Sequence, residues 1–299
     1  MKILECVPNV SEGRDPAVIQ AIARAVRQVS GVHFADIHSD PDHHRSVFTF
    51  LGSPEAAESA ALALAEAALA RIDMRTRHGV HPRLGAVDVV PFVPLRDTTM
   101  AEAVTVARQF GRTIAEQFGL PVYFYGEAAT RPERRELAEI RRGEYEGLPS
   151  KLSDPAWTPD AGPAVFNPQS GAIVVGARRL LIAFNVWLDG NHLDAAHAIA
   201  RAIRQSSGGL PGVQAIGVRL TRQGAVQVAI NLTDYRRTPL KDLLQAVRRE
   251  ARVRGARIAR EELVGLAPRD AFSGADPKAL GLDIRPEQIL EAHLPKAGG

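Results

Sequence analysis

The spacing of apolar residues near the start of the chain predicts a strand, a turn and an amphipathic helix. Residues 2–8 form an apolar run. Asp15 and Pro16 then form a typical helix start, because aspartate can cap the first N–H groups and proline fits the first helical position. Apolar side chains recur at helical spacing until Gly31, where we expect the helix to end.

The same patterns continue through the first 120 residues. They predict strands at 33–37, 46–51 and 87–95, and helices at 53–72 and 99–119. Together with the first strand and helix, this gives the order strand, helix, strand, strand, helix, loop, strand. That order is the split βαβ arrangement of ferredoxin-like folds.

A second unit of the same kind follows. The patterns predict strands at 180–188, 213–220 and 225–232, and helices at 191–206 and from 238 onward. We therefore predict an α+β protein with two ferredoxin-like halves, residues 1–178 and 179–299, whose antiparallel sheets are covered by helices.

Two segments do not follow either period, residues 73–86 and 151–177. Both are long and contain several glycines and prolines, which favours shaped, ordered loops over solvated linkers. Long ordered loops in compact domains often carry function, so both segments are candidates for site loops.

Composition narrows the possible partners. The formal net charge is only +3 and the chain lacks runs of like charge, which disfavours a general nucleic-acid-binding surface. The single cysteine, Cys6, excludes an intrachain disulfide and fits a reducing, cytoplasmic compartment. An early acid, Glu5, argues against a signal peptide, and an apolar run of ~18 residues that could span a membrane is missing.

The loop from Gly79 to Gly85 presents a single imidazole, His81, and a guanidinium, Arg83. Imidazole is the side chain best suited to proton transfer near neutral pH, so these two residues are the candidate catalytic pair. A surface histidine in a turn is the alternative interpretation.

Three further polar groups are candidates for substrate contacts. Histidines and acids between residues 38 and 45 could hold a metal, but their spacing matches no closed zinc pattern, and we expect no metal there. The turn after the first strand could equally be a helix cap. The acid after an aromatic strand near residue 125 could equally form a surface ion pair. The substrate-binding candidates are Asn9, Glu12, Asp40, His44, Arg45 and Glu127.

Taken together, longer motifs in the chain resemble the glutamate formimidoyltransferase family, in its stand-alone form without a cyclodeaminase domain. Most of them lie before residue 190, in one consistent order. They are residues 5–13, 81–88, 121–123, 125–128, 140–146, 159–163, 176–178 and 182–185.

This resemblance implies two ferredoxin-like halves flanking a folate groove, tetrahydrofolate as co-substrate, and a homodimer. It places the family's catalytic histidine at His81. It also implies that the folate-binding loop comprises Gly162, Pro163, Ala164, Val165, Phe166, Asn167, Pro168, Gln169, Ser170 and Gly171.

The implied reaction moves the formimino group of N-formimino-L-glutamate to N5 of tetrahydrofolate. His81 would transfer the protons, while Glu127 or Asp40 would stabilise the cationic amidine and Arg83 or Arg45 would hold substrate carboxylates. We expect small-molecule partners and neither nucleic acid nor membrane.

Two alternatives remain open at this point. The same scaffold could transfer a formyl group between 5-formyltetrahydrofolate and glutamate, in which case N–H donors should face the developing oxyanion. A non-catalytic pterin- or nucleic-acid-binding protein is the more distant alternative. Aromatic residues make up only 5% of the chain, which argues against RNA binding on a sheet surface.

Overall fold

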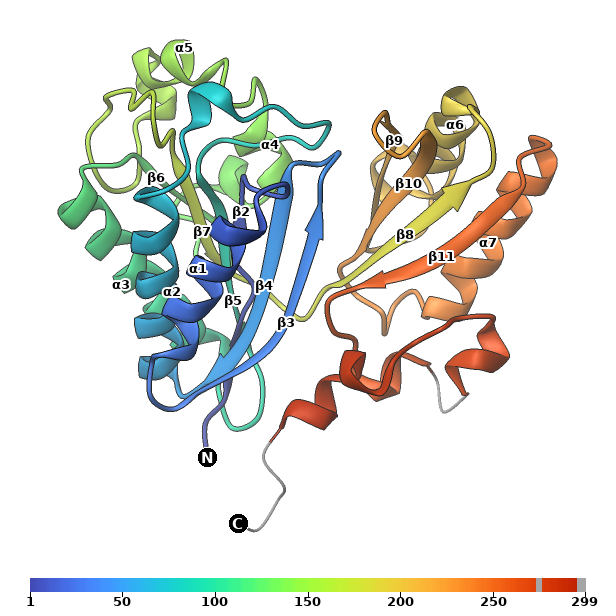
Figure 1. Cartoon of the computed structure of the whole chain (residues 1–299), viewed down its shortest axis with the longest axis horizontal. Coiled ribbons are helices and arrows are strands. Elements are labelled where there is room, and N and C mark those ends of the chain that lie inside the picture. Colours follow the sequence, from blue (N-terminus) through green and yellow to red (C-terminus); the bar gives the residue numbers. More distant parts are fainter. Residues whose placement is uncertain (273–275, 295–299) are drawn as a thin grey trace. The chain divides into compact units, whose positions relative to one another are not determined.

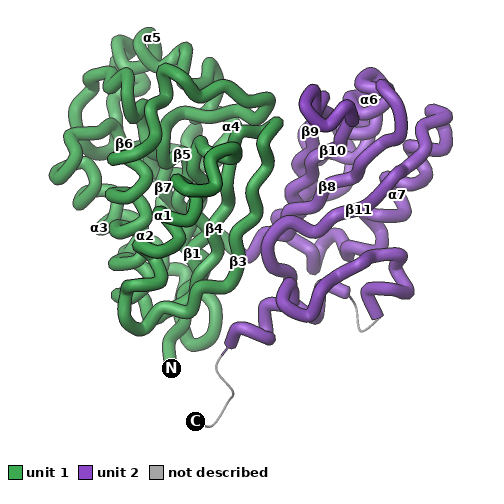
Figure 2. Tube along the Cα trace, viewed as in Figure 1, with its two compact units in different colours: residues 1–179 green, residues 180–299 purple. Residues whose placement is uncertain are grey.

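The computed structural model describes residues 1–272 and 276–294. The chain divides into two compact units, residues 1–179 and residues 180–299 (Figure 2). Each unit combines a β-sheet with helices, so the α+β class predicted from the sequence is confirmed.

Unit 1 is built on a seven-stranded sheet (Figure 1). Two short strands, β1 and β2, both lie between β4 and β5, and β3 extends the sheet beyond β4. These pairings are antiparallel. The strands are β1 (Leu4–Cys6), β2 (Asn9–Val10), β3 (Val32–Asp40), β4 (Arg45–Gly52), β5 (Val87–Pro94), β6 (Val122–Gly126) and β7 (Ile173–Ala177).

The part of the sheet formed by β5, β7 and β6 differs from the expected purely antiparallel sheet. Strand β7 pairs in parallel with both β5 and β6, so the sheet is mixed and not purely antiparallel. Residues 173–177 were expected to belong to a loop. They form a short apolar run that is buried on both faces, and such a run lacks the alternation that reveals a strand.

Helices cover both faces of the first sheet. α1, α2 and α3 share one apolar core with β1, β4 and β5, whereas α4 and α5 pack on the opposite face against β6 and β7. Their bounds are α1 (Pro16–Arg27), α2 (Pro54–Leu69), α3 (Met100–Phe118), α4 (Leu137–Arg141) and α5 (Leu148–Ser153). As predicted, Asp15 caps α1, accepting a 2.8 Å hydrogen bond from the backbone N–H of Ala17.

Unit 2 contains an antiparallel sheet with the strand order β11-β8-β10-β9. Its strands are β8 (Ile182–Leu188), β9 (Val213–Leu220), β10 (Ala225–Leu232) and β11 (Ile258–Val264). Helices α6 (Leu193–Ile203) and α7 (Leu240–Val253) pack on one face, where they share a core with Val226, Val228 and Ile230. Within residues 1–272 and 276–294, no helix has the length and apolar character needed to cross a membrane.

Candidate active site

His81 lies in a loop that is tied down on both sides of the imidazole. Before it, the Val80 backbone N–H donates to the Asp42 carbonyl at 3.0 Å. After it, the Ser11 hydroxyl donates to the Gly85 carbonyl at 2.7 Å. The loop then leads into β5. Just before this strand, the Leu84 N–H donates a 2.8 Å hydrogen bond to the carboxylate of Asp88, which lies on β5. The loop is therefore ordered, as its glycines and proline predicted.

The His81 ring has an assignable tautomer. Its Nδ1 lies 2.8 Å from the Pro82 carbonyl oxygen, which can only accept a hydrogen bond, so Nδ1 carries the hydrogen. The Arg45 guanidinium, 3.4 Å from the same nitrogen, cannot then donate to it. Nε2 is left with its lone pair, which is the form required of a general base.

The surroundings of His81 favour the neutral ring. Burial, followed by the positive charges of Arg45 and Arg141 and the neighbouring His43, lowers the pKa of His81 well below its ordinary value. The His43 and His81 ring centroids are 5.5 Å apart. At neutral pH this imidazole is therefore uncharged.

A buried ion-pair network supports this arrangement. Asp88, on β5, is fully buried and pairs with Arg45 at 2.7 Å and with Arg141. Arg45 also donates through Nε to the Asn9 side chain at 2.7 Å. The substrate-binding candidates Arg45 and Asn9 are thus bonded to one another, and Arg45 also pairs with Asp88. These contacts hold the Arg45 cation beside His81.

The guanidinium of Arg83, the other catalytic candidate, is bonded to the turn at residues 144–146 and to the Arg77 carbonyl. Its guanidinium donates to Glu146 at 2.7 Å, to Glu144 at 3.2 Å and to the Arg77 carbonyl at 2.9 Å. The side chain is 6% exposed, so its donors are used within the protein. Sequence spacing placed Arg83 beside His81 but could not show that its side chain runs to the turn at residues 144–146.

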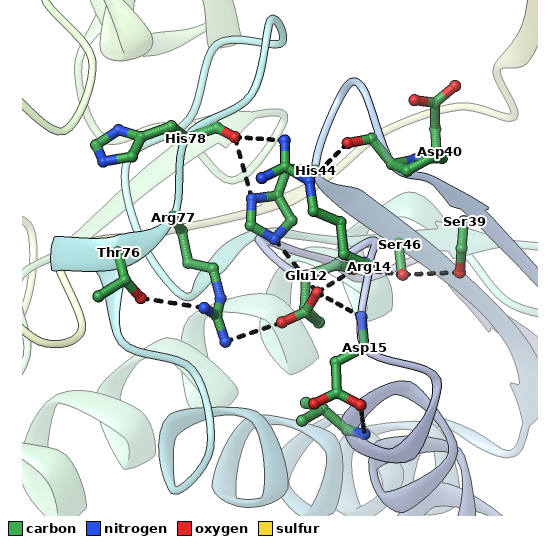
Figure 3. Close-up of polar contacts among 12 residues, drawn as sticks. Glu12, Arg14, Asp15, Ser39, Asp40, His44, Ser46, Thr76, Arg77 and His78 are labelled. Atoms are coloured by element: carbon green, nitrogen blue, oxygen red, sulfur yellow. Dashed lines mark hydrogen bonds and ion pairs between the residues drawn. The ribbon is translucent and has the colours of Figure 1, made fainter. Parts of the chain in front are cut away.

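A second polar cluster surrounds Glu12, in the turn between β2 and α1 (Figure 3). Its carboxylate pairs with Arg77 at 2.9 Å and with His44 at 3.3 Å, and accepts the backbone N–H of Arg14 at 2.7 Å. Burial alone would raise its pKa, but these hydrogen bonds and the Arg77 charge outweigh it and lower the pKa of Glu12 to about 2. Glu12 is therefore a permanent buried anion.

Asp40 shapes the turn between β3 and β4. One of its carboxylate oxygens accepts the backbone N–H groups of Asp42 and His43, each at 2.8 Å. In the described ranges, 1–272 and 276–294, no group of three His, Cys, Asp or Glu side chains is placed to hold a metal ion.

Glu127 lies away from the other candidates. The parallel pairing of β5 and β6 with β7 sets Phe92 level with Ala177 and Gly126. Glu127 therefore follows the carboxyl end of β6, whereas His81 precedes the amino end of β5. The Glu127 side chain is exposed and pairs with Arg135 at 2.7 Å, as in the surface ion-pair interpretation.

The loop from Gly162 to Gly171 adjoins the His81 loop at one end. The Ala86 N–H donates to the Ser170 carbonyl at 2.9 Å, and the Ala172 N–H donates to the Leu84 carbonyl at 3.1 Å. Its outer part lines an open pocket of about 530 Å³. The pocket is lined by Arg75, Gly119, Pro163, Val165, Phe166, Asn167, Pro168 and Gln169. The lining combines apolar side chains with the amides of Asn167 and Gln169, and the Arg75 guanidinium is paired with Asp73 at 2.9 Å.

Sequence analysis assigned no role to four residues of the site. Asp88 and Arg141 form the network next to His81, His43 lies against its ring, and Arg77 pairs with Glu12. A charged residue within the apolar run of β5 was a visible signal for Asp88. Arg141 gave no comparable signal, because its contact depends on the packing of α4.

Comparison with known proteins identifies the family. Residues 3–178 match the formiminotransferase domain, N-terminal subdomain, and residues 183–277 match the formiminotransferase domain. A glutamate formimidoyltransferase of Streptococcus pyogenes serotype M1 is 41% identical over 98% of this chain and 99% of its own length. One from Thermoplasma acidophilum is 42% identical over 99% of both chains. The formimidoyltransferase-cyclodeaminase of Sus scrofa is 45% identical over 92% of this chain, which covers 52% of that longer protein. Matches over nearly the whole chain and in both units show that it belongs to the formiminotransferase family.

Proposed function

We propose that this protein transfers the formimino group of N-formimino-L-glutamate to N5 of tetrahydrofolate, releasing glutamate. The observation that carries the proposal is the match to relatives named glutamate formimidoyltransferase over almost their full length. The neutral, base-competent imidazole of His81 provides the proton transfer that such a reaction needs.

His81 would act in two steps. Nε2 first accepts the proton that N5 loses when it bonds to the formimino carbon. The resulting imidazolium, already held through Nδ1 by the Pro82 carbonyl, then delivers a proton to the departing glutamate nitrogen. Such general acid–base catalysis contributes about 10²–10⁴-fold to the rate.

The loop from Gly162 to Gly171 is the proposed folate-binding segment. Its pocket offers the apolar side chains of Pro163 and Phe166 to a ring system. Arg75 also lines the pocket, and its guanidinium is paired with the Asp73 carboxylate at 2.9 Å. The bonds between this loop and residues 84–86 connect the proposed folate segment to the His81 loop.

The finer architectural assignments belong to the same proposal. The strand order supports two ferredoxin-like halves. In unit 1 the order is β5, then β1 and β2 in line, then β4 and β3, and in unit 2 it is β11, β8, β10 and β9. The N-terminal half, residues 1–178, would carry the catalytic histidine. A folate groove, a homodimer and a cytoplasmic location stay predictions.

A formyl donor is the second candidate. The charged groups that lower the pKa of His81 are the guanidinium groups of Arg45 and Arg141, both paired with Asp88, and the carboxylate of Glu127 lies at the other end of the sheet. Cations beside the reacting carbon suit the oxyanion of a formyl intermediate better than a cationic amidine.

One assay separates these possibilities. Glutamate release from N-formimino-L-glutamate is measured with and without tetrahydrofolate, and the reverse formyl reaction is measured with 5-formyltetrahydrofolate and glutamate. Folate-dependent release from the formimino donor supports the proposal. Turnover with the formyl pair alone would transfer the assignment to the second candidate, and tight folate binding without turnover would indicate a binding protein.

A further inference from the structure

His44 lies between the Glu12 carboxylate and the loop that carries His81. It is 5% exposed, at the beginning of β4. Its Nε2 is 3.3 Å from the Glu12 carboxylate, and its Nδ1 is 3.1 Å from the backbone carbonyl of His78. Figure 3 shows the ring between these two groups.

Both partners of this ring are acceptors. Glu12 is ionised, held so by Arg77 and by backbone N–H groups, and a carbonyl oxygen has no hydrogen to give. A neutral imidazole carries one N–H and could bond to only one of them. Only a ring with hydrogens on both nitrogens donates to both, and its positive charge is matched by the Glu12 anion.

The carbonyl that His44 binds is a fixed point of the loop. It also accepts the Arg14 guanidinium at 2.9 Å, and Arg14 in turn donates to the Pro41 carbonyl at 2.8 Å. The next residue, Gly79, packs so closely that an added Cβ would lie 2.1 Å from the His43 carbonyl oxygen. The backbone three residues before His81 is thus held against the turn between β3 and β4.

We propose that His44 is a positioning residue for the transfer reaction: its doubly protonated ring ties Glu12 to the His78 carbonyl and so fixes the place from which His81 works. This inference rests on the proposed function for its effect on turnover. It assigns distinct tasks to two histidines of the site, because His81 keeps a free nitrogen and His44 uses both.

The backbone of His44 allows a clean test. Its φ is +51°, in the left-handed region that asparagine and aspartate tolerate better than most residues. His44→Asn and His44→Asp therefore share size and backbone preference. Asparagine still offers N–H donors to Glu12 and the carbonyl, whereas aspartate offers only acceptors and adds a second anion beside Glu12.

We expect His44→Asp to lower kcat by about 10²-fold, the effect of displacing a catalytic group by about 1 Å, with smaller changes in KM. His44→Asn should retain most of the kcat. The control is His78→Ala, which removes an exposed ring and keeps the carbonyl that His44 binds, and it should match the native enzyme. Equal kcat values for the asparagine and aspartate variants would overturn the proposal.

A second readout does not depend on turnover. In protein labelled with ¹⁵N-histidine, both ring nitrogens of His44 should carry a hydrogen, and His81 should show a protonated Nδ1 and a bare Nε2. The His81 pattern should persist in His44→Asn and become a mixture of tautomers in His44→Asp. A bare nitrogen on His44 in the native protein refutes the assignment. This outcome does not depend on whether the enzyme uses a formimino or a formyl substrate.

Thermal unfolding accompanies both measurements. If His44→Asp does not fold, His44→Ala takes its place, because alanine also lacks donors but adds no anion. The alanine variant should then fall below His44→Asn in kcat, and a kcat equal to that of the asparagine variant rejects the proposal.

Discussion

The two units order their sheet strands alike and yet bury different chemistry. Within the described residues, unit 1 buries charged side chains around its sheet: Glu5, Glu12, Asp40, Asp42, His44, Arg45, Arg83, Asp88 and Arg134. In the described part of unit 2 the buried polar residues are uncharged: Asn185, Gln227, Thr238 and Gln288. One carboxylate there, that of Glu261, has a side chain that is only 6% exposed, and it pairs with Arg248. Burying a charge costs free energy unless partners compensate it. The gathering of buried charged side chains in unit 1 therefore indicates that they serve more than the packing of its core.

The difference shows how a common strand order can serve separate purposes. In unit 1 the amino end of β5 is preceded by a long, clamped loop, and the buried arginines and acids there hold one another and the loop. In unit 2 the corresponding sheet is closed by apolar packing against α6 and α7. We infer that unit 1 supplies the proton-transfer machinery, and each prediction below sets a change in one unit against a matched control variant.

The largest expected effect is on catalysis. His81→Gln should fold but lose about 10²–10⁴-fold in kcat, because glutamine cannot accept and return a proton. The matched change in unit 2 is His192→Gln, which replaces an exposed histidine at the start of α6. Steady-state glutamate release with both substrates measures the two variants. Near-native kcat in His81→Gln would falsify the catalytic assignment and remove the main functional difference between the units.

The next effect is on stability. Asp88→Asn removes the anion that pairs with Arg45 and Arg141, and leaves two buried cations uncompensated. Breaking a buried pair in this way costs about 3–5 kcal/mol in the free energy of unfolding.

Asp189→Asn in unit 2 is the control for this change. Its partner Arg257 is 85% exposed, and surface ion pairs contribute only about 0–1 kcal/mol. Denaturant unfolding of the variants and the native protein gives the comparison. Similar losses in both variants would mean that the buried network contributes no more than a surface pair.

Most helices and strands of the two units could be predicted from the sequence. Alternation of apolar residues placed the strands at 213–220 and 225–232 where β9 and β10 occur. It missed β7 and β11. β7 is uniformly buried, and β11 contains Arg260, Glu261 and Glu262, so neither shows the period-two pattern on which the prediction rests.

The site was less predictable, because sequence order fixes neither the direction of a side chain nor the end of the sheet on which a residue lies. His81 could be singled out from the glycines and proline of its loop. The partners of Arg83, by contrast, depend on a turn about sixty residues later in the chain. The sequence could not show that Glu127 and His81 lie at opposite ends of the sheet, because this follows from the parallel pairing of β5 and β6 with β7.

A smaller stability effect is expected in unit 2. Gln227, on β10, is fully buried, and among residues 1–272 and 276–294 neither its amide nitrogen nor its amide oxygen has a hydrogen-bond partner. Gln227→Met keeps the shape and removes both polar atoms, which should raise the free energy of unfolding by about 1–3 kcal/mol.

The comparison for this change is Asn231→Met, an exposed position on the same strand, which should alter stability little. Thermal denaturation measures both variants. A destabilised Gln227→Met would show that the amide has partners in solution, and that unit 2 also holds a polar group in place for a purpose.

The smallest effect is a displacement of the pH profile. His81 acts as a base in its neutral form, so kcat/KM should fall as the pH drops through the lowered pKa of His81. After burial and Arg45, the Arg141 charge is the next cause of that lowering. Arg141→Gln removes this cation and weakens the neutralisation of Asp88, and both changes raise the pKa of His81. The acid limb should therefore move to higher pH, whereas Arg142→Gln, which alters an exposed neighbour, should leave it in place. An acid limb that stays at the same pH in Arg141→Gln would mean that a group other than His81 controls it. The buried charges of unit 1 would then have no effect on the proton transfer that we assign to this unit.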